Sequence, residues 1–152
     1  MANKVLWVAE SEAELLTTEL NSAGATDTVV DGTDYANATN KFRFADFLLA
    51  VTFAANCDAD AYIELHILYK LDGTHYGDGE DGDAANPTLN SNTRVGTFII
   101  GADGATTPVY HQITGVPLSP KDFRVAVKCA TGQTMASSGN TLKMYPYNEE
   151  LQ

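Results

Sequence analysis

The chain has 152 residues, of which 44% are hydrophobic and only 19% are charged, and its formal net charge is −11. This length and composition fit one ordinary domain with a buried core and argue against disorder. The excess of 20 acidic over 9 basic residues opposes binding to nucleic acid or to an anionic membrane, because both need clustered Lys and Arg.

Neither a membrane span nor a secretory signal is visible in the sequence. No apolar run approaches the ~20 residues that cross a bilayer. Val5–Ala9 is too short, and has the wrong flanks, for a signal peptide. We therefore expect the chain to be made in a cytosol.

Residues 1–40 are predicted to form an N-terminal arm that is partly extended. Lys4–Val8 has the composition of a short strand. Ser11–Glu14 forms a capping-box pattern before ELLTTEL, whose leucines recur at helical spacing, and this pattern predicts one short helix. The stretch from 21 to 40 is rich in Gly, Ala, Thr, Asn and Asp, which indicates extended or loosely packed chain.

Residues 41–152 are predicted to form the compact domain, and its clearest strand is Asp60–Leu71 (DAYIELHILYKL). Strand side chains alternate between two faces, so the odd-numbered residues from Ala61 to Leu71 form an apolar face that we expect in the core. The opposite face carries Tyr62, Glu64, His66 and Lys70.

The longest apolar stretch, Phe42–Phe53, is apolar on both faces, as is typical of a central strand. Because only a short turn separates it from Asp60–Leu71, we expect these two strands to pair as an antiparallel hairpin.

Four further strands are predicted, separated by turn residues: Arg94–Ile100, Val109–Ile113, Asp122–Cys129 and Thr141–Tyr145. Seven or eight strands at regular spacing, with almost no helix, indicate an all-β fold. We predict an antiparallel β-sandwich of the jelly-roll type behind the N-terminal arm.

An acidic, glycine-rich loop follows the strand Asp60–Leu71. Its carboxylates could supply oxygen ligands to Ca²⁺. Their spacing does not match an EF-hand, and a solvated loop without a metal is the favoured alternative. The carboxylates in question are Asp72, Asp78, Glu80, Asp81 and Asp83.

Histidines, cysteines and sequence motifs give no catalytic or metal site. His66, His75 and His111 come from three separate segments without ligand spacing, so surface or interface positions are expected. Cys57 and Cys129 lie outside any metal-binding pattern; buried thiols are favoured, and a disulfide between them is the alternative. With no G-x-S-x-G, P-loop or H-E-x-x-H motif, we expect no enzyme activity, catalytic residue, cofactor or metal.

Exposed aromatic residues could form a platform for a sugar, because amphipathic rings are favoured where one side is dry and the other wet. Core or subunit-interface packing is the favoured alternative. The platform candidates are Trp7, Tyr62, Tyr76 and Tyr110.

Several stretches together resemble small decoration (cement, or head auxiliary) proteins of tailed bacteriophage capsids. The resemblance implies a jelly-roll virion structural protein, without catalytic residues, that binds and stabilises the outside of the capsid. It further implies a homotrimer, the major capsid protein as partner, and a place on the virion exterior after assembly in the host cytoplasm. The stretches are Glu14–Ser22, Ile67–Gly79, Val95–Thr107 and Asp122–Glu149.

On this hypothesis the segment from Lys4 to Leu20 contacts the trimer or capsid neighbours, through Lys4, Leu6, Trp7, Leu15, Leu16 and Leu20. The alternative function is a glycan-binding β-sandwich module for host attachment, in a head or tail fibre. It is motivated by Tyr76 and Tyr110, which lie near predicted loops.

Overall fold

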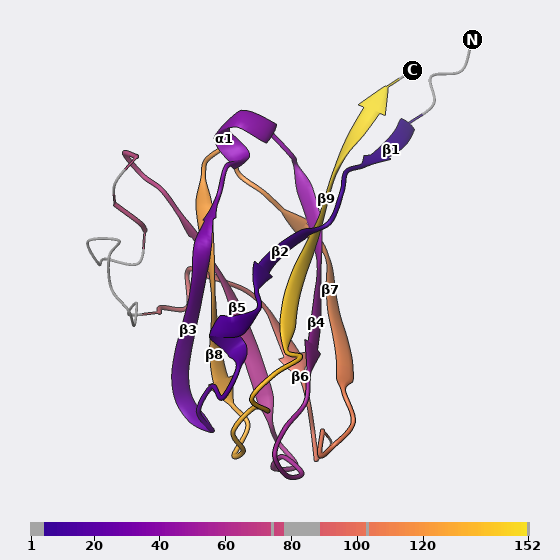
Figure 1. Cartoon of the computed structure of the whole chain (residues 1–152). Helices are drawn as coiled ribbons and strands as arrows, with labels where there is room; N and C mark the ends of the chain where they lie inside the picture. Colours follow the sequence, from indigo (N-terminus) through magenta and orange to yellow (C-terminus); the bar gives the residue numbers. More distant parts are fainter. Residues whose placement is uncertain (1–4, 74, 78–88, 103, 152) are drawn as a thin grey trace.

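A computed structural model describes residues 5–73, 75–77, 89–102 and 104–151 as two antiparallel sheets packed face to face (Figure 1). Sheet A has the order β1-β9-β4-β7, with β2 also paired to β9, and sheet B has the order β3-β8-β5-β6. The predicted all-β sandwich is therefore confirmed. The strands are β1 (Val5–Ala9), β2 (Ala13–Leu16), β3 (Thr26–Tyr35), β4 (Phe44–Val51), β5 (Tyr62–Tyr69), β6 (Arg94–Ile99), β7 (Val109–Pro117), β8 (Phe123–Ala130) and β9 (Thr141–Leu151).

The core lies between the sheets and is filled by the inward faces of β4, β5, β8 and β9. Along β5 the odd-numbered side chains from Ala61 to Ile67 are buried, as predicted, but Leu71 is 59% exposed because β5 has already ended at Tyr69. Each fully buried large apolar side chain contributes about 1.5–3 kcal/mol. The largest of them include Phe47, Phe53, Phe98, Phe123, Leu49, Ile63, Leu65 and Leu142.

The expected hairpin between the two longest predicted strands is wrong. β4 lies between β9 and β7 in sheet A, whereas β5 lies between β8 and β6 in sheet B. Phe53 and Cys57, in the connection, are both buried. Phe53 also bridges to Ala105 and Met135. Because these residues pack at one end of the core, the connection between β4 and β5 crosses from sheet A to sheet B and does not form a hairpin turn.

The predicted helix after Ser11 is also wrong. Ala13–Leu16 forms β2 and pairs with β9, and only Thr18–Leu20 makes a single 3₁₀ turn, η1. Leu16 and Leu20 are fully buried against the core, so tertiary packing overrides local helix propensity. Because β3 also pairs with β8, the structure places much of the expected N-terminal arm inside the sandwich.

β1 and the last part of β9 pair with each other and extend beyond the sandwich as a two-stranded ribbon (Figure 1). Within the described residues, helical turns are limited to η1 and α1 (Asn37–Asn40), and no helix is long and apolar enough to cross a membrane.

Both cysteines are buried and free, so the structure favours the thiol interpretation over a disulfide. Burial, with a contribution from Asp58, raises the pKa of Cys57 to about 11. Burial alone raises the pKa of Cys129 to about 12. Both thiols are therefore protonated and unreactive at neutral pH.

Candidate ligand-binding site

A cleft of about 330 Å³ lies on the outer face of sheet A, where β1 meets β9. It is lined by Trp7 and Ala9 from β1, Asp46 from β4 and Tyr147 from β9. Tyr147 lies opposite Ala9 on one side and opposite Phe44 on the other. Because side chains alternate along each strand, this register brings the lining residues to one face although they are up to 140 positions apart.

Two aromatic rings, those of Trp7 and Tyr147, line the cleft, and the Phe44 ring packs against both. The Trp7 indole packs edge-on against Tyr147, with ring centroids 5.3 Å apart, and against Phe44 at 6.2 Å. Phe44 and Tyr147 are stacked at 5.7 Å with an interplanar angle of 19°. Trp7 is nevertheless 58% exposed. These edge contacts hold the indole while leaving much of it open to a ligand.

Asp46 supplies the polar part of the cleft. Its Oδ1 accepts a hydrogen bond of 2.8 Å from the backbone N–H of Gly115, whose φ of +69° favours glycine, and one of 3.4 Å from the Tyr147 hydroxyl. Burial and the nearby Asp46 carboxylate raise the pKa of Tyr147, so its hydroxyl remains a donor at neutral pH. The carboxylate is thereby fixed, and its second oxygen can accept a hydrogen bond from a ligand.

An exposed ring beside a fixed acceptor suits a ligand with an apolar face and hydroxyl groups at its rim. Pockets for small molecules combine these features: mostly apolar walls and a few well-placed polar groups. Trp7 was a platform candidate from the sequence, but Asp46 and Tyr147 were not, because nothing in the local sequence links them to Trp7.

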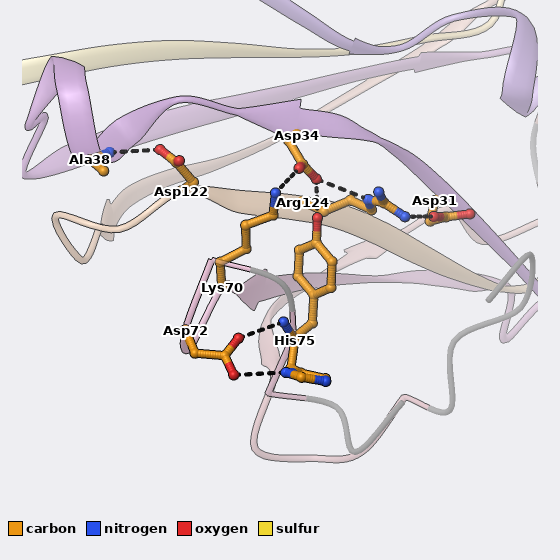
Figure 2. Close-up of polar contacts among 9 residues, drawn as sticks. Asp31, Asp34, Ala38, Lys70, Asp72, His75, Asp122 and Arg124 are labelled. Atoms are coloured by element: carbon orange, nitrogen blue, oxygen red, sulfur yellow. Dashed lines mark hydrogen bonds and ion pairs between the residues drawn. The ribbon is translucent and has the colours of Figure 1, made fainter. Parts of the chain in front are cut away.

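Tyr76, a second platform candidate, cannot serve as one because it is buried. Its hydroxyl donates to Asp34, and Figure 2 shows Lys70 and Arg124 bonded to the same carboxylate. The Arg124 guanidinium lies 4.9 Å from the ring centroid and Lys70 Nζ 5.6 Å. Asp34 accepts the Tyr76 hydroxyl and also pairs with Lys70 at 2.5 Å. This cluster holds the segment after β5 against the outer face of sheet B.

The Tyr76 cluster predicts an acid-sensitive contribution to stability. Burial raises the pKa of Asp34, but its bonds to Lys70 and Tyr76 outweigh burial, and the net pKa is lowered. A lowered carboxyl pKa stabilises the fold above the unfolded pKa of about 3.9, and this stabilisation is lost as pH falls through the folded pKa. We expect Asp34→Asn to cost about 1 kcal/mol at pH 7, since the carboxylate is partly exposed.

Urea unfolding of the wild type and of Asp34→Asn from pH 7 to pH 2.5 measures this contribution. The difference in unfolding free energy between the two is expected to shrink below about pH 4. Asp60→Asn, at a carboxylate outside the Tyr76 cluster, is the control. A difference that stays constant over the whole range would contradict the assignment.

The two remaining platform candidates lie apart from the cleft. Tyr62 is partly exposed on sheet B, where it borders a polar hollow with Asp27, Asp58 and Asp60. Tyr110 is exposed on β7.

Of the six residues predicted to contact partners, Leu6 and Trp7 are exposed, whereas Leu15, Leu16 and Leu20 are buried in the chain's own core. Lys4 lies outside the described residues. The contact role of these six stays a prediction.

Most of the acidic loop lies outside the described residues, including Asp78, Glu80, Asp81 and Asp83. Asp72 is described and bonds His75 Nδ1 at 2.7 Å. Within the described residues no group of three or more His, Cys, Asp or Glu side chains is arranged to hold a metal ion. The expectation of a surface position holds for His75, but His66 is only 2% exposed.

Comparison with solved structures finds carbohydrate-binding modules. One is the CBM36-1 domain of a multidomain xylanase from the hindgut metagenome of Trinervitermes trinervoides (TM-score 0.48, 16% identity, 93% of this chain and 96% of that one). A second is a CBM35 in complex with a disaccharide that contains glucuronic acid (TM-score 0.47, 16% identity, 97% and 95%). A third is a CBM36 in complex with calcium and xylotriose (TM-score 0.39, 11% identity, 100% of both chains).

A scan against protein-family models finds no match, and a search of curated protein sequences finds none either. The solved structures overturn the resemblance to phage proteins, because they are carbohydrate-binding modules and not capsid decoration proteins. The expected major capsid partner, the homotrimer and the place on the virion exterior are corrected with it.

Proposed function

We propose that this chain is a glycan-binding β-sandwich module that binds carbohydrate in the cleft formed by Trp7, Asp46 and Tyr147. The observation that supports this most directly is the exposed Trp7 indole, held edge-on by two other rings beside a fixed carboxylate. The C–H face of a sugar ring can pack on the indole while its hydroxyl groups bond Asp46 and the Tyr147 hydroxyl. The cleft volume is at the lower end of the ~300–1,000 Å³ typical of ligand pockets.

The chemistry of the cleft favours binding over catalysis. Hydrolysis of a glycosidic bond generally uses two carboxyl groups about 5–9.5 Å apart, one as acid and the other as base or nucleophile. Among the described residues that line the cleft, Asp46 is the only acidic one. The lining residues can therefore hold a sugar, but they do not include the pair of carboxyl groups that would cleave it.

Replacing Trp7 with alanine is expected to weaken glycan binding by at least about tenfold, because it removes the central aromatic contact of the cleft. The full chain is first applied to a glycan array, and the best ligand is then measured with both proteins by isothermal titration calorimetry. Trp7→Phe should retain part of the affinity because it keeps a ring. Thermal unfolding should change little, since Trp7 is largely exposed.

The matched control is Tyr110→Ala, which removes a similarly exposed aromatic ring from β7, outside the cleft, and should leave affinity unchanged. A chain that binds no glycan on the array would contradict the proposal. So would a ligand whose affinity is the same for the wild type and Trp7→Ala.

A further inference from the structure

One buried hydrogen-bond acceptor on sheet B, away from the aromatic cleft, has no partner in the part of the chain that the structure describes. His66 is on β5 and is only 2% exposed, yet its Nε2 has no hydrogen-bond partner among the described residues. A buried polar atom in this state is costly, and such atoms are rare in folded proteins. They often mark a place where something else supplies the missing bond.

The hydrogen bonds around His66 determine which nitrogen carries its proton. Thr93 Oγ1 donates its single hydrogen to the backbone carbonyl of Asn90 at 2.9 Å. The same oxygen lies 2.9 Å from His66 Nδ1, so there it must accept. The proton of the neutral imidazole is therefore on Nδ1, and Nε2 presents a lone pair.

Nε2 faces a second acceptor. Glu64 Oε2 lies 3.6 Å away, and Glu64 Oε1 is bound to Arg94 Nη1 at 2.6 Å. Burial raises the pKa of Glu64, but the hydrogen bond and charge of Arg94 outweigh it and keep the carboxyl ionised. Burial lowers the pKa of His66 more than Glu64 raises it, so the ring is neutral at pH 7. Two acceptors thus face each other and need a donor between them.

A small cavity of about 150 Å³ adjoins this pair. It is lined by Glu64, His66, Arg94 and Lys128 together with residues 89–91. Lys128 lies directly across from Glu64 on β8, and its Nζ bonds Asp27 at 2.9 Å. An ammonium has three donors and a guanidinium five, so Lys128 and Arg94 can each donate further hydrogen bonds.

This arrangement selects for a particular ligand chemistry. A cation is disfavoured by Arg94 and Lys128, and an anion by Glu64 and by the carboxylates that already neutralise both basic groups. A hydroxyl group both donates and accepts. One hydroxyl can donate to Glu64, beside the His66 ring, while its neighbour accepts from Lys128 or Arg94. We propose that the Glu64–His66 cavity is a second binding site, for a neutral vicinal diol such as one sugar residue.

The test uses the full-length ¹⁵N-labelled chain and methyl glycosides of glucose, galactose, mannose and xylose as probes, each up to about 100 mM, because millimolar affinity is expected of so small a site. At least one probe should cause saturable shifts at the amides of Thr93, Arg94 and Lys128. Glu64→Gln should weaken this binding at least about tenfold, because its amide N–H can bond Nε2 directly and close the gap.

The imidazole ¹⁵N spectrum supplies a readout independent of any ligand: His66 should titrate below the ordinary histidine range and carry its proton on Nδ1 at pH 7. Binding should also weaken as pH falls through that pKa, because protonated Nε2 would itself donate to Glu64. The charged groups that act on this ring are Glu64 on β5, Arg94 on β6 and Lys128 on β8.

Trp7→Ala separates this site from the aromatic cleft, since it should leave the shifts at Thr93 and Lys128 unchanged whether or not the cleft binds glycan. Three results would overturn the second site: no saturable shift with any probe, equal affinity for the wild type and Glu64→Gln, or a proton on Nε2 at pH 7.

Discussion

An Asn37→Leu variant is expected to lose about 3–5 kcal/mol of unfolding free energy. Leucine is of similar size, but it cannot form the three hydrogen bonds that the buried Asn37 side chain makes. Asn37 is fully buried at the start of α1. Its Nδ2 donates to the carbonyls of Phe42 at 3.1 Å and Ser119 at 2.6 Å, and its Oδ1 accepts from the Phe42 N–H at 3.0 Å. The substitution leaves these backbone groups without partners inside the protein.

Urea unfolding followed by circular dichroism measures the loss. Thr39→Leu, an exposed position on the same helical turn, is the control and should change stability by no more than about 0.5 kcal/mol. Equal losses in the two variants would show that the cost arises from the turn and not from the hydrogen bonds of Asn37.

Phe47→Ala is expected to lower the free energy of unfolding by about 3–5 kcal/mol, because it leaves a cavity between the two sheets. Phe47 is fully buried in the middle of β4, opposite Met144 on β9 and Ile113 on β7. In a chain of this size such a loss lowers Tm by roughly 10 °C or more.

The neighbouring substitution Leu48→Ala provides the comparison, since Leu48 is half-buried on the outer face of the same strand and should cost about 1 kcal/mol. Differential scanning calorimetry of the two variants compares the two faces of β4 directly. If Leu48→Ala is as damaging as Phe47→Ala, then the assignment of inner and outer faces is wrong.

Strands whose side chains alternate strictly could be predicted from the sequence. β5 and β8 were identified because their apolar residues recur every second position, and the burial of Ile63 and Val127 follows that pattern. β4 was identified differently, as the longest apolar stretch of the chain. β3 was not identified: among its ten residues only Val29, Val30 and Tyr35 are large and apolar. Its strand conformation comes from pairing with β8, which the local sequence does not encode.

The two proposed binding sites depend on contacts that no local pattern could give. Trp7 and Tyr147 are 140 positions apart and meet only because β1 pairs with the end of β9. His66 was expected near the surface because it lies on the polar face of β5. It is buried because residues 89–93 fold over that face and Thr93 bonds its ring. Long-range register and loop packing, rather than composition, determined both sites.

β9 is the structural feature with the widest consequence, because it pairs with β1, β2 and β4 at once. Three strands from the first third of the chain thus share a partner that begins 90 residues after the end of β4. During translation, sheet A cannot assemble until β9 has left the ribosome, and the apolar faces of β2 and β4 are exposed until then. Pairing at such sequence separation also folds slowly, in milliseconds to seconds. The newly made chain therefore depends most on chaperones until β9 has emerged and paired.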